Sequence, residues 1–177
     1  MSEIKLYNGD CLEIMKQISD KSVDLVLTDP PYGITASEWD KIIPFDKLWN
    51  QLNRIIKPFG TVLLFCSNDF LFKVHDSNIK DFKYLLYWEK SKSSNVLHSK
   101  NRPCQKIECI SVFSKGSIAH KSLSNSRMTY NPQGVVSNGF SKISQKFAKN
   151  RSNTLGGLDL IKLVKYMKVL RIFQVIY

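Results

Sequence analysis

Apolar residues follow two distinct patterns in the first part of the chain. Residues 23–27 and 61–66 form nearly continuous apolar runs, which are typical of strands buried on both faces of a sheet. Between them, apolar residues recur at helical spacing over 45–56, and a Lys-Pro-Phe-Gly turn follows. Strand, helix and strand of these lengths predict a parallel α/β sheet with a crossover connection.

Weaker patterns extend this sheet on both sides. Residues 4–7 predict a short strand, and residues 12–18 predict a helix of one or two turns. Further strands are predicted at 82–88 and 108–113, joined by a loop over 91–105. Ligands of open α/β sheets bind beyond the carboxyl ends of the strands, so functional residues are expected where the central apolar run ends.

The pattern changes after residue 115. Residues 116–157 contain eight Ser, five Asn and no acidic residue, which predicts loops rather than a packed core. Within the last segment, 158–177, apolar residues recur at helical spacing over 160–171 with lysines between them. That spacing predicts a basic amphipathic helix, a type that packs on a core more often than on a membrane, DNA or another protein.

The loop after the central apolar run opens with Asp29-Pro30-Pro31-Tyr32. Proline fixes its own φ and biases the preceding residue toward extended geometry, so this loop is shaped before any ligand binds. A carboxylate, two rigid prolines and an aromatic ring form a compact site for a planar group that carries an amine. The alternative is a proline-rich exit from a buried strand, and the flanking apolar run together with the upstream Gly-Asp pair favours the functional interpretation.

These residue types suit methyl transfer to an aromatic amine. The amine of adenine or cytosine is a poor nucleophile, because its lone pair is delocalised into the ring. If Asp29 and the carbonyl of Pro30 both accept hydrogen bonds from the amine, the nitrogen moves toward tetrahedral geometry and its lone pair becomes available. Tyr32 would stack on the base. Alignment with an activated methyl donor then supplies most of the rate through positioning and preorganised electrostatics.

Five segments carry a resemblance to one protein family. They are residues 8–14, 23–28, 29–34, 48–66 and 87–92. In these segments the chain resembles the amino-methylating, S-adenosylmethionine-dependent DNA methyltransferases of restriction–modification systems and phages. The arrangement is the one in which the Asp-Pro-Pro-Tyr block precedes the cofactor loop. The resemblance extends over residues 4–135.

The resemblance implies an α/β, Rossmann-like methyltransferase sheet that is incomplete on its C-terminal side. It also implies that the catalytic block Asp29-Pro30-Pro31-Tyr32 holds a base flipped out of double-stranded DNA, because the amine is otherwise engaged in base pairing. Asp10 and Asp29 are the implied cofactor-binding residues, with Asp10 near the adenosine part of S-adenosylmethionine. Adenine is the implied target, since Asp opens the block, which is a tendency of the family.

The resemblance further implies a division of the chain. Residues 1–115 form the catalytic part of the methyltransferase domain, 116–157 occupy the position of target recognition, and 158–177 do not look like the family. The family's Phe-x-Gly-x-Gly cofactor loop is missing from the sequence, and Gly156-Gly157 are not preceded by the strand that such a loop requires. A truncated or frame-shifted gene would produce such an ending.

A second departure lies at the strand predicted over 108–113. Relatives often have His-Glu before this strand, whereas here Ile107 stands in the histidine position and Glu108 keeps the carboxylate. The strand prediction survives this change. We do not expect Glu108 to be catalytic.

Charge is distributed unevenly along the chain. Residues 1–89 carry 10 basic and 13 acidic residues, whereas residues 90–177 carry 16 and 2, so the two halves have net charges of −3 and +14. A solvated loop explains isolated charges but not this sustained excess. Cations among Ser and Asn suit phosphate contacts, and double-stranded DNA is the expected partner. The candidate nucleic-acid-binding residues are Lys90, Lys92, Lys100, Arg102 and Lys106.

Several alternatives remain open at the level of sequence. The basic half alone would sustain a non-catalytic DNA-binding remnant. The Asp-Pro-Pro-Tyr block would also suit methyl transfer to the amine of cytosine, to RNA or to a protein amide. Amide-methylating relatives, however, usually open the block with Asn. A homodimer or a partner restriction–modification subunit is compatible with the chain. Glu38, Trp39 and Asp40 are expected in a mobile loop, with core packing of Trp39 as the equal alternative.

Composition also indicates the cellular location and the absence of certain kinds of site. No run approaches the roughly 18 apolar residues of a membrane span, and the N-terminus lacks the pattern of a signal peptide. The four cysteines are few and unevenly spaced and the three histidines are scattered, so neither a disulfide framework nor a metal site is expected. We therefore expect a cytoplasmic protein of one domain without a membrane partner.

Overall fold

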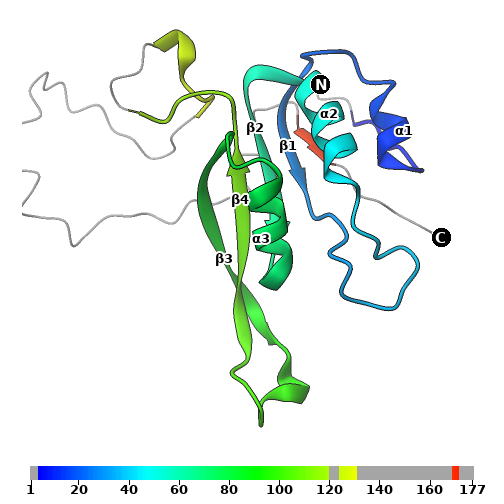
Figure 1. Cartoon of the computed structure of the whole chain (residues 1–177), viewed down its shortest axis with the longest axis vertical. Coiled ribbons are helices and arrows are strands. Elements are labelled where there is room, and N and C mark those ends of the chain that lie inside the picture. Colours follow the sequence, from blue (N-terminus) through cyan, green and yellow to red (C-terminus); the bar gives the residue numbers. More distant parts are fainter. Residues whose placement is uncertain (1–3, 120–123, 131–168, 172–177) are drawn as a thin grey trace, which may run out of the picture. The chain divides into compact units, whose positions relative to one another are not determined.

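The computed structural model describes residues 4–119, 124–130 and 169–171 (Figure 1). Every helix and strand given below belongs to one compact unit, formed by Met1–Thr129 and Lys168–Tyr177. Most of the predicted target-recognition region lies outside the described residues, as does the first part of the predicted C-terminal helix.

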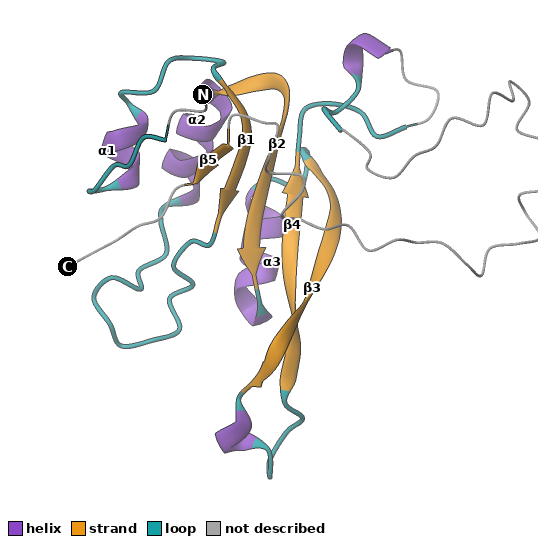
Figure 2. Ribbon diagram, turned by 180° about the vertical axis from the view of Figure 1, so that it is seen from behind, coloured by secondary structure: helices purple, strands orange, loops and turns teal. Residues whose placement is uncertain are grey.

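A mixed sheet of five strands forms the centre of this described unit (Figure 2). In chain order the strands are β1 (Val23–Thr28), β2 (Ile56–Cys66), β3 (Phe82–Ser94), β4 (Gln105–Phe113) and β5 (Val169–Arg171). Their order across the sheet is β3-β4-β2-β1-β5. Strand β1 is parallel to β2 and β5, whereas β4 is antiparallel to β2 and β3. The predicted parallel pair with its crossover is confirmed, and an antiparallel hairpin extends the sheet on one side.

Helices cover one face of this sheet in both views (Figures 1 and 2). In the described ranges the helices are α1 (Cys11–Met15), α2 (Phe45–Ile55) and α3 (Asn68–Ser77), with 3₁₀ turns η1 (Val96–His98) and η2 (Ser124–Ser126). Helix α2 provides the crossover, and its Leu48, Leu52 and Ile55 are buried against the sheet, as the apolar stripe of a covering helix requires. In the described part of the chain, no helix is long and apolar enough to cross a membrane.

The core between helices and sheet holds the strand ends in place. Val26, Leu64 and Phe113 come from three adjacent strands and are each at most 1% exposed. They share one cluster with Leu52 of α2 and Val74 of α3. Burying a side chain of this size stabilises a fold by roughly 1.5–3 kcal/mol. The carboxyl ends of β1 and β2 are therefore fixed by packing before any loop is considered.

Arg54 joins α2 to the short helix α1. Its guanidinium donates to the carbonyl oxygens of Met15 at 2.6 Å and Ile18 at 2.8 Å, and it pairs with Asp20 at 2.5 Å. Carbonyl groups at the end of a helix lack partners within the helix. Arg54 satisfies them from the neighbouring helix, so α1 is held in place although it has only five residues.

Of two predictions for the N-terminal region, the strand is wrong and the helix is confirmed with different bounds. Residues 4–7 form no strand, and Ile4 and Leu6 are 83% and 92% exposed. No neighbouring strand among the described residues pairs with this segment, and alternation alone does not form a strand without such a partner. The helix predicted over 12–18 ends at Met15, where the backbone passes into turns.

Predictions for the hairpin and the C-terminal segment also need correction. The strand predicted to end at residue 88 continues to Ser94, which pairs with Gln105, so the loop predicted over 91–105 is shorter. Helical spacing over 160–171 predicted a helix, yet Val169–Arg171 form β5. Pairing with β1 satisfies the backbone there, and this outweighs the periodicity of the side chains. The sequence pattern does not predict α3.

Candidate active site

The Asp-Pro-Pro-Tyr block leaves the sheet directly after β1, which lies between β2 and β5. The pairing of β1 with β2 continues to the end of β1, where Thr28 pairs with Leu64. Pro30 and Pro31 are buried, whereas Asp29 is exposed. The prolines thus anchor the loop to the sheet and leave the carboxylate accessible. This is the carboxyl end of a parallel strand, the position that sequence predicts for a functional loop.

Two contacts hold the side chain of Tyr32. Its ring stacks on Phe70 of α3, with ring centroids 4.6 Å apart and planes inclined by 17°. Phe70 is 3% exposed and also contacts Phe45 at a centroid distance of 6.0 Å. The Tyr32 hydroxyl hydrogen-bonds to the Asp29 carboxylate. Tyr32 is therefore a fixed part of the site, and Phe70 covers one face of its ring.

Asp29 and Tyr32 share one electrostatic environment. Asp29 is exposed, and neighbouring atoms shield its carboxyl group from water only in part. This burial raises the pKa of Asp29, the hydrogen bond from Tyr32 lowers it, and the charge of Glu108 raises it, with a net increase. Burial, followed by the hydrogen bond to Asp29 and its charge, raises the pKa of Tyr32. The phenol therefore stays protonated at neutral pH and acts as a donor.

Glu108 brings a second carboxylate to this environment from β4. Lys90 Nζ of β3 donates to its Oε1 at 2.7 Å and also to the hydroxyl of Ser94. The Lys90 and Glu108 side chains are 17% and 25% exposed. Sequence reasoning treated Lys90 as a phosphate contact and Glu108 as non-catalytic. The structure places them in one ion pair whose carboxylate acts electrostatically on Asp29 and Tyr32.

Cys66 ends β2 next to this group and is fully buried. Its Sγ lies 3.2 Å from Ser111 Oγ and 3.5 Å from the carbonyl oxygen of Cys109. Burial raises the pKa of the Cys66 thiol. The thiolate is the nucleophilic form of cysteine, so this thiol is unreactive at neutral pH. Its contacts give it a packing role at the edge of the site.

The loop after the block is organised by Asp40, a residue that the sequence assigned only to a mobile loop. Its Oδ1 accepts a hydrogen bond from the N–H of Gly33 at 2.8 Å, and its Oδ2 accepts from Ile34 at 2.9 Å and Thr35 at 2.6 Å. Asp40 is 6% exposed. The only sequence signal is a glycine followed by an aspartate within one loop, a pattern too common to identify such a contact in advance.

Asp10 has a local structural role. It is the N-cap of α1, where its Oδ1 accepts a hydrogen bond from Leu12 N at 2.7 Å. N-cap aspartates stabilise helices in this way. Among the described residues, no hydrogen bond or ion pair joins Asp10 to the Asp-Pro-Pro-Tyr block. Its predicted contact with the cofactor stays a prediction.

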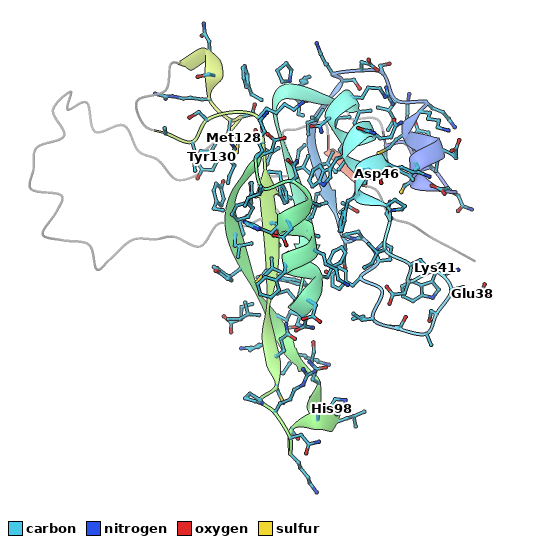
Figure 3. All side chains as sticks on the ribbon, in the orientation of Figure 1. Glu38, Lys41, Asp46, His98, Met128 and Tyr130 are labelled. Carbon is cyan, nitrogen blue, oxygen red and sulfur yellow. The ribbon has the colours of Figure 1, made fainter. Side chains whose placement is uncertain are left out.

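The predicted nucleic-acid-binding residues fall into two groups along the β3–β4 hairpin. Lys90 and Lys106 are ion-paired within the hairpin, Lys90 with Glu108 and Lys106 with Glu89 at 2.5 Å. The second group, which is exposed, consists of Lys92, Lys100 and Arg102. The hairpin extends beyond the other strands, and His98 marks its end (Figure 3).

A metal centre and a cavity are two other kinds of site that the described residues could form. No group of three or more His, Cys, Asp or Glu side chains in that part of the chain is placed to hold a metal ion. A shallow cavity lies near the first residues of β2, lined by Trp49, Lys57 and Ser114 among others. It contains no residue of the Asp-Pro-Pro-Tyr block and belongs to a different part of the sheet.

Known proteins resemble the chain in both sequence and structure. Type II methyltransferase M.BamHI of Bacillus amyloliquefaciens is 33% identical over 72 residues, covering 34% of this chain and 17% of the relative. M.BglII of Bacillus subtilis is 38% identical over 65 residues, covering 33% and 18%. M2.MboI of Moraxella bovis is 26% identical over 111 residues, covering 48% and 40%. The chain thus spans less than half the length of these curated relatives.

Part of the chain also matches solved structures. The cytosine-N4-specific PvuII DNA methyltransferase matches 61% of this chain and 48% of its own, with 21% identity and a TM-score of 0.48. The M1.HpyAVI–SAM complex matches 64% and 55%, with 26% identity and a TM-score of 0.43.

A family model described as DNA methylase matches residues 23–155, which is more than half of the chain. The match begins at β1 and includes the Asp-Pro-Pro-Tyr block and the β3–β4 hairpin, whereas β5 lies outside it. The predicted Rossmann-like methyltransferase sheet, in partial form, is confirmed. The chain belongs to the DNA methylase family.

Proposed function

We propose that the chain is the catalytic part of a DNA methyltransferase that transfers a methyl group from S-adenosylmethionine to the exocyclic amine of adenine. One observation carries the proposal. The exposed Asp29 carboxylate follows β1 directly, and Tyr32 is fixed beside it by the stack on Phe70 and the hydrogen bond to Asp29. A hydrogen-bond acceptor and an aromatic ring are thereby presented together at the end of a rigid strand.

The chemistry of the site follows from these two groups. The flipped base would lie with its amine donating to Asp29 and to the carbonyl oxygen of Pro30, which has no N–H to compete. Phe70 covers one face of the Tyr32 ring. Tyr32 would contact the base with the opposite face. The amine nitrogen would bond to the methyl carbon as the carbon–sulfur bond of the donor breaks. The sulfur would leave as a neutral thioether, and the surplus amine proton would pass to Asp29 or to water. Positioning and fixed electrostatics supply the rate.

S-adenosylmethionine supplies the methyl group as an electrophile attached to a positively charged sulfur. Asp10 and Asp29 both carry exposed carboxylates. Their negative charge suits the positively charged sulfur of the cofactor. One oxygen of Asp10 accepts the hydrogen bond from Leu12 N. We assign the adenosine end to Asp10 and the reacting end to Asp29.

Adenine is proposed in preference to cytosine because Asp rather than Ser opens the block, which is a tendency of the family and not a derivation. Double-stranded DNA is proposed as the substrate through the exposed cations Lys92, Lys100 and Arg102. No acidic residue lies between Lys90 and Ile107 in the sequence, so phosphate binding meets no local repulsion.

The test is to identify the methylated product. The purified chain is incubated with radiolabelled S-adenosylmethionine and unmethylated DNA, and the DNA is then digested to nucleosides and separated by chromatography. We expect label in N6-methyl-2′-deoxyadenosine. Label in N4-methyl-2′-deoxycytidine would replace adenine by cytosine as the target. DNA binding without any transfer would identify a non-catalytic DNA-binding protein.

Two variants assign the reaction to the site. Asp29→Asn keeps the size of the side chain but removes its charge, and transfer should fall by about 10²–10³-fold, the range for loss of one preorganised electrostatic group. Asp46→Asn is the matched control, because Asp46 is an exposed aspartate at the start of α2 (Figure 3). Equal loss in both variants would contradict the assignment of Asp29.

A further inference from the structure

Gly33, Ile34 and Thr35 form a nest of backbone donors around the Asp40 carboxylate. Three consecutive N–H groups donate to its two oxygens at 2.6–2.9 Å, and the N–H of Asp40 donates to the carbonyl of Ser37 at 3.0 Å. Successive backbone N–H groups of this kind bind anions strongly. The loop therefore closes on itself after Tyr32, although residues 33–39 are exposed.

The conformation of Gly33 makes this closure possible. Its φ is +69°, in the left-handed region, and a Cβ atom there would lie 3.0 Å from Ile42 Cγ1. Partial burial of Asp40 opposes its ionisation, but the hydrogen bonds from Gly33, Thr35 and Ile34 outweigh this and lower the pKa of Asp40 to about 2. The carboxylate is thus ionised, and the closure holds, throughout the neutral range.

The closed loop leaves two large apolar side chains without cover. Ile34 is 68% exposed and Trp39 is 51% exposed, so the alternative that Trp39 packs in the core is wrong. Ile34 is two residues from Tyr32, and Trp39 is adjacent to the residue that closes the loop. Exposed apolar and aromatic groups next to a binding site commonly mark a contact surface.

Charge on this loop is small. Glu38 and Lys41 carry opposite charges (Figure 3). The Asp40 carboxylate is held by three backbone N–H donors, so the loop has a net charge of −1. An exposed tryptophan is suited to stacking on bases, because every base has a π-face.

We infer that Asp40 is a positioning residue that holds the Gly33–Asp40 loop closed and so presents Trp39 to the DNA beside the flipped base. This inference rests on the proposed function and adds to it a surface that no residue of the Asp-Pro-Pro-Tyr block provides. Trp39 would stack on the strand from which the base has left. Asp40 itself touches neither DNA nor cofactor.

Tryptophan fluorescence tests the inference without requiring methyl transfer. DNA that stacks on Trp39 should quench part of the emission of the wild-type chain, and this part should be absent in Trp39→Phe. Asp40→Asn should fold, as judged by its melting temperature, yet lose more than half of the Trp39 quench. Glu38→Gln, which removes a charge from the same loop without a contact to the nest, should keep the wild-type quench.

A second variant disturbs the nest without touching the carboxylate. Gly33→Ala places a methyl group at a positive φ against Ile42, and it should reduce the quench as Asp40→Asn does. This variant decides the question if Asp40→Asn does not fold. Equal quenching in the wild type, Asp40→Asn and Gly33→Ala, or in the wild type and Trp39→Phe, would overturn the inference.

The two proposals fail in different ways. A quench that depends on Trp39 and Asp40 without any methyl transfer would support the inference about the loop while contradicting the enzymatic activity. Methyl transfer by Asp40→Asn at the wild-type rate, with an unchanged quench, would support the activity and overturn the role of Asp40. Absence of any quench by DNA in the wild type would also overturn it.

Discussion

The Asp-Pro-Pro-Tyr block and the end of the β3–β4 hairpin are built in opposite ways. Pro30 and Pro31 are buried, and Tyr32 stacks on the buried Phe70. At the hairpin end, by contrast, Leu97 is 97% exposed and the neighbouring cations project from the surface. The first region is fixed by the core of the protein, whereas the second is held by hydrogen bonds and ion pairs within the hairpin.

This difference matches what each region is proposed to do. Activation of an amine requires the reacting groups to be held within a fraction of an ångström, which packing against a core provides. Contacts to phosphates are long-ranged and tolerant of position, because they depend on charge and on the release of counterions. A rigid catalytic end and an exposed basic arm are therefore two solutions to two different physical problems.

Removal of a buried ring should separate the two regions most strongly. Phe70→Ala deletes a side chain that is 3% exposed and contacts both Tyr32 and Phe45, and it should lower the free energy of unfolding by about 3–5 kcal/mol. Leu97→Ala, at the hairpin end, should change it by less than about 0.5 kcal/mol. Urea denaturation measures both. A similar loss in the two variants would contradict the distinction between a packed region and an exposed one.

Charge removal should have the reverse pattern. Replacing Lys92, Lys100 and Arg102 by Gln should leave stability unchanged and weaken DNA binding. Each phosphate contact contributes about 0.9 to the slope of log K against log salt, so the slope should decrease by about 2–3. Fluorescence anisotropy with labelled duplex DNA over a range of salt concentrations measures this.

A matched triple variant controls for net charge. It replaces three exposed lysines outside the hairpin by Gln: Lys47, Lys73 and Lys80. The net charge changes by the same amount, yet the salt slope should stay within about 0.5 of the wild-type value if contacts rather than overall charge determine it. Equal slopes for the two triple variants would show that the hairpin has no special part in DNA binding.

The two ion pairs of the hairpin sharpen the comparison within one element. Lys90→Met leaves the half-buried Glu108 without its cation, which should cost about 1–2 kcal/mol. Lys106→Met breaks the exposed pair with Glu89 and should cost at most about 0.5 kcal/mol. Thermal melting of the two variants measures the difference. Equal effects would mean that burial does not strengthen the pair near the site.

Sequence reasoning located the parts of the fold that depend on local patterns. The apolar runs of β1 and β2 and the stripe of α2 were sufficient, because burial on the sheet determines these residues directly. It failed at Ile4 and Leu6, where an apolar alternation has no partner strand. It failed again at Val169–Arg171, where pairing with β1 decides the structure. Elements that depend on a distant partner are not encoded in their own residues.

The candidate site shows the same limit. Asp29 and Tyr32 were predicted because their residue types and their position after a strand carry the chemistry. Asp40 was not, since its partners are backbone N–H groups that any sequence would supply. The ion pair of Lys90 with Glu108 was also missed, because it joins residues 18 positions apart in the chain and only the register of the hairpin brings them together.

The smallest expected effect concerns the carboxylate at the centre of the site. The pKa of Asp29 is raised above its ordinary value of 3.8, first by burial. A carboxyl group with a raised pKa in the folded state binds its proton more tightly there than in the unfolded chain. Its contribution to stability is therefore complete below the ordinary pKa and is lost as the pH rises through the raised value.

Asp29→Asn should consequently be slightly more stable than the wild type at pH 7, although it loses methyl transfer. The gain should be less than about 1 kcal/mol, because the residue is largely exposed and solvent screens its charge. It should disappear near pH 4 and below, where the wild-type carboxyl group is protonated. Urea denaturation of both proteins at several pH values measures this difference. A variant less stable than the wild type at pH 7 would show that ionised Asp29 stabilises the fold. Holding the carboxylate at this site would then not lower the free energy of unfolding.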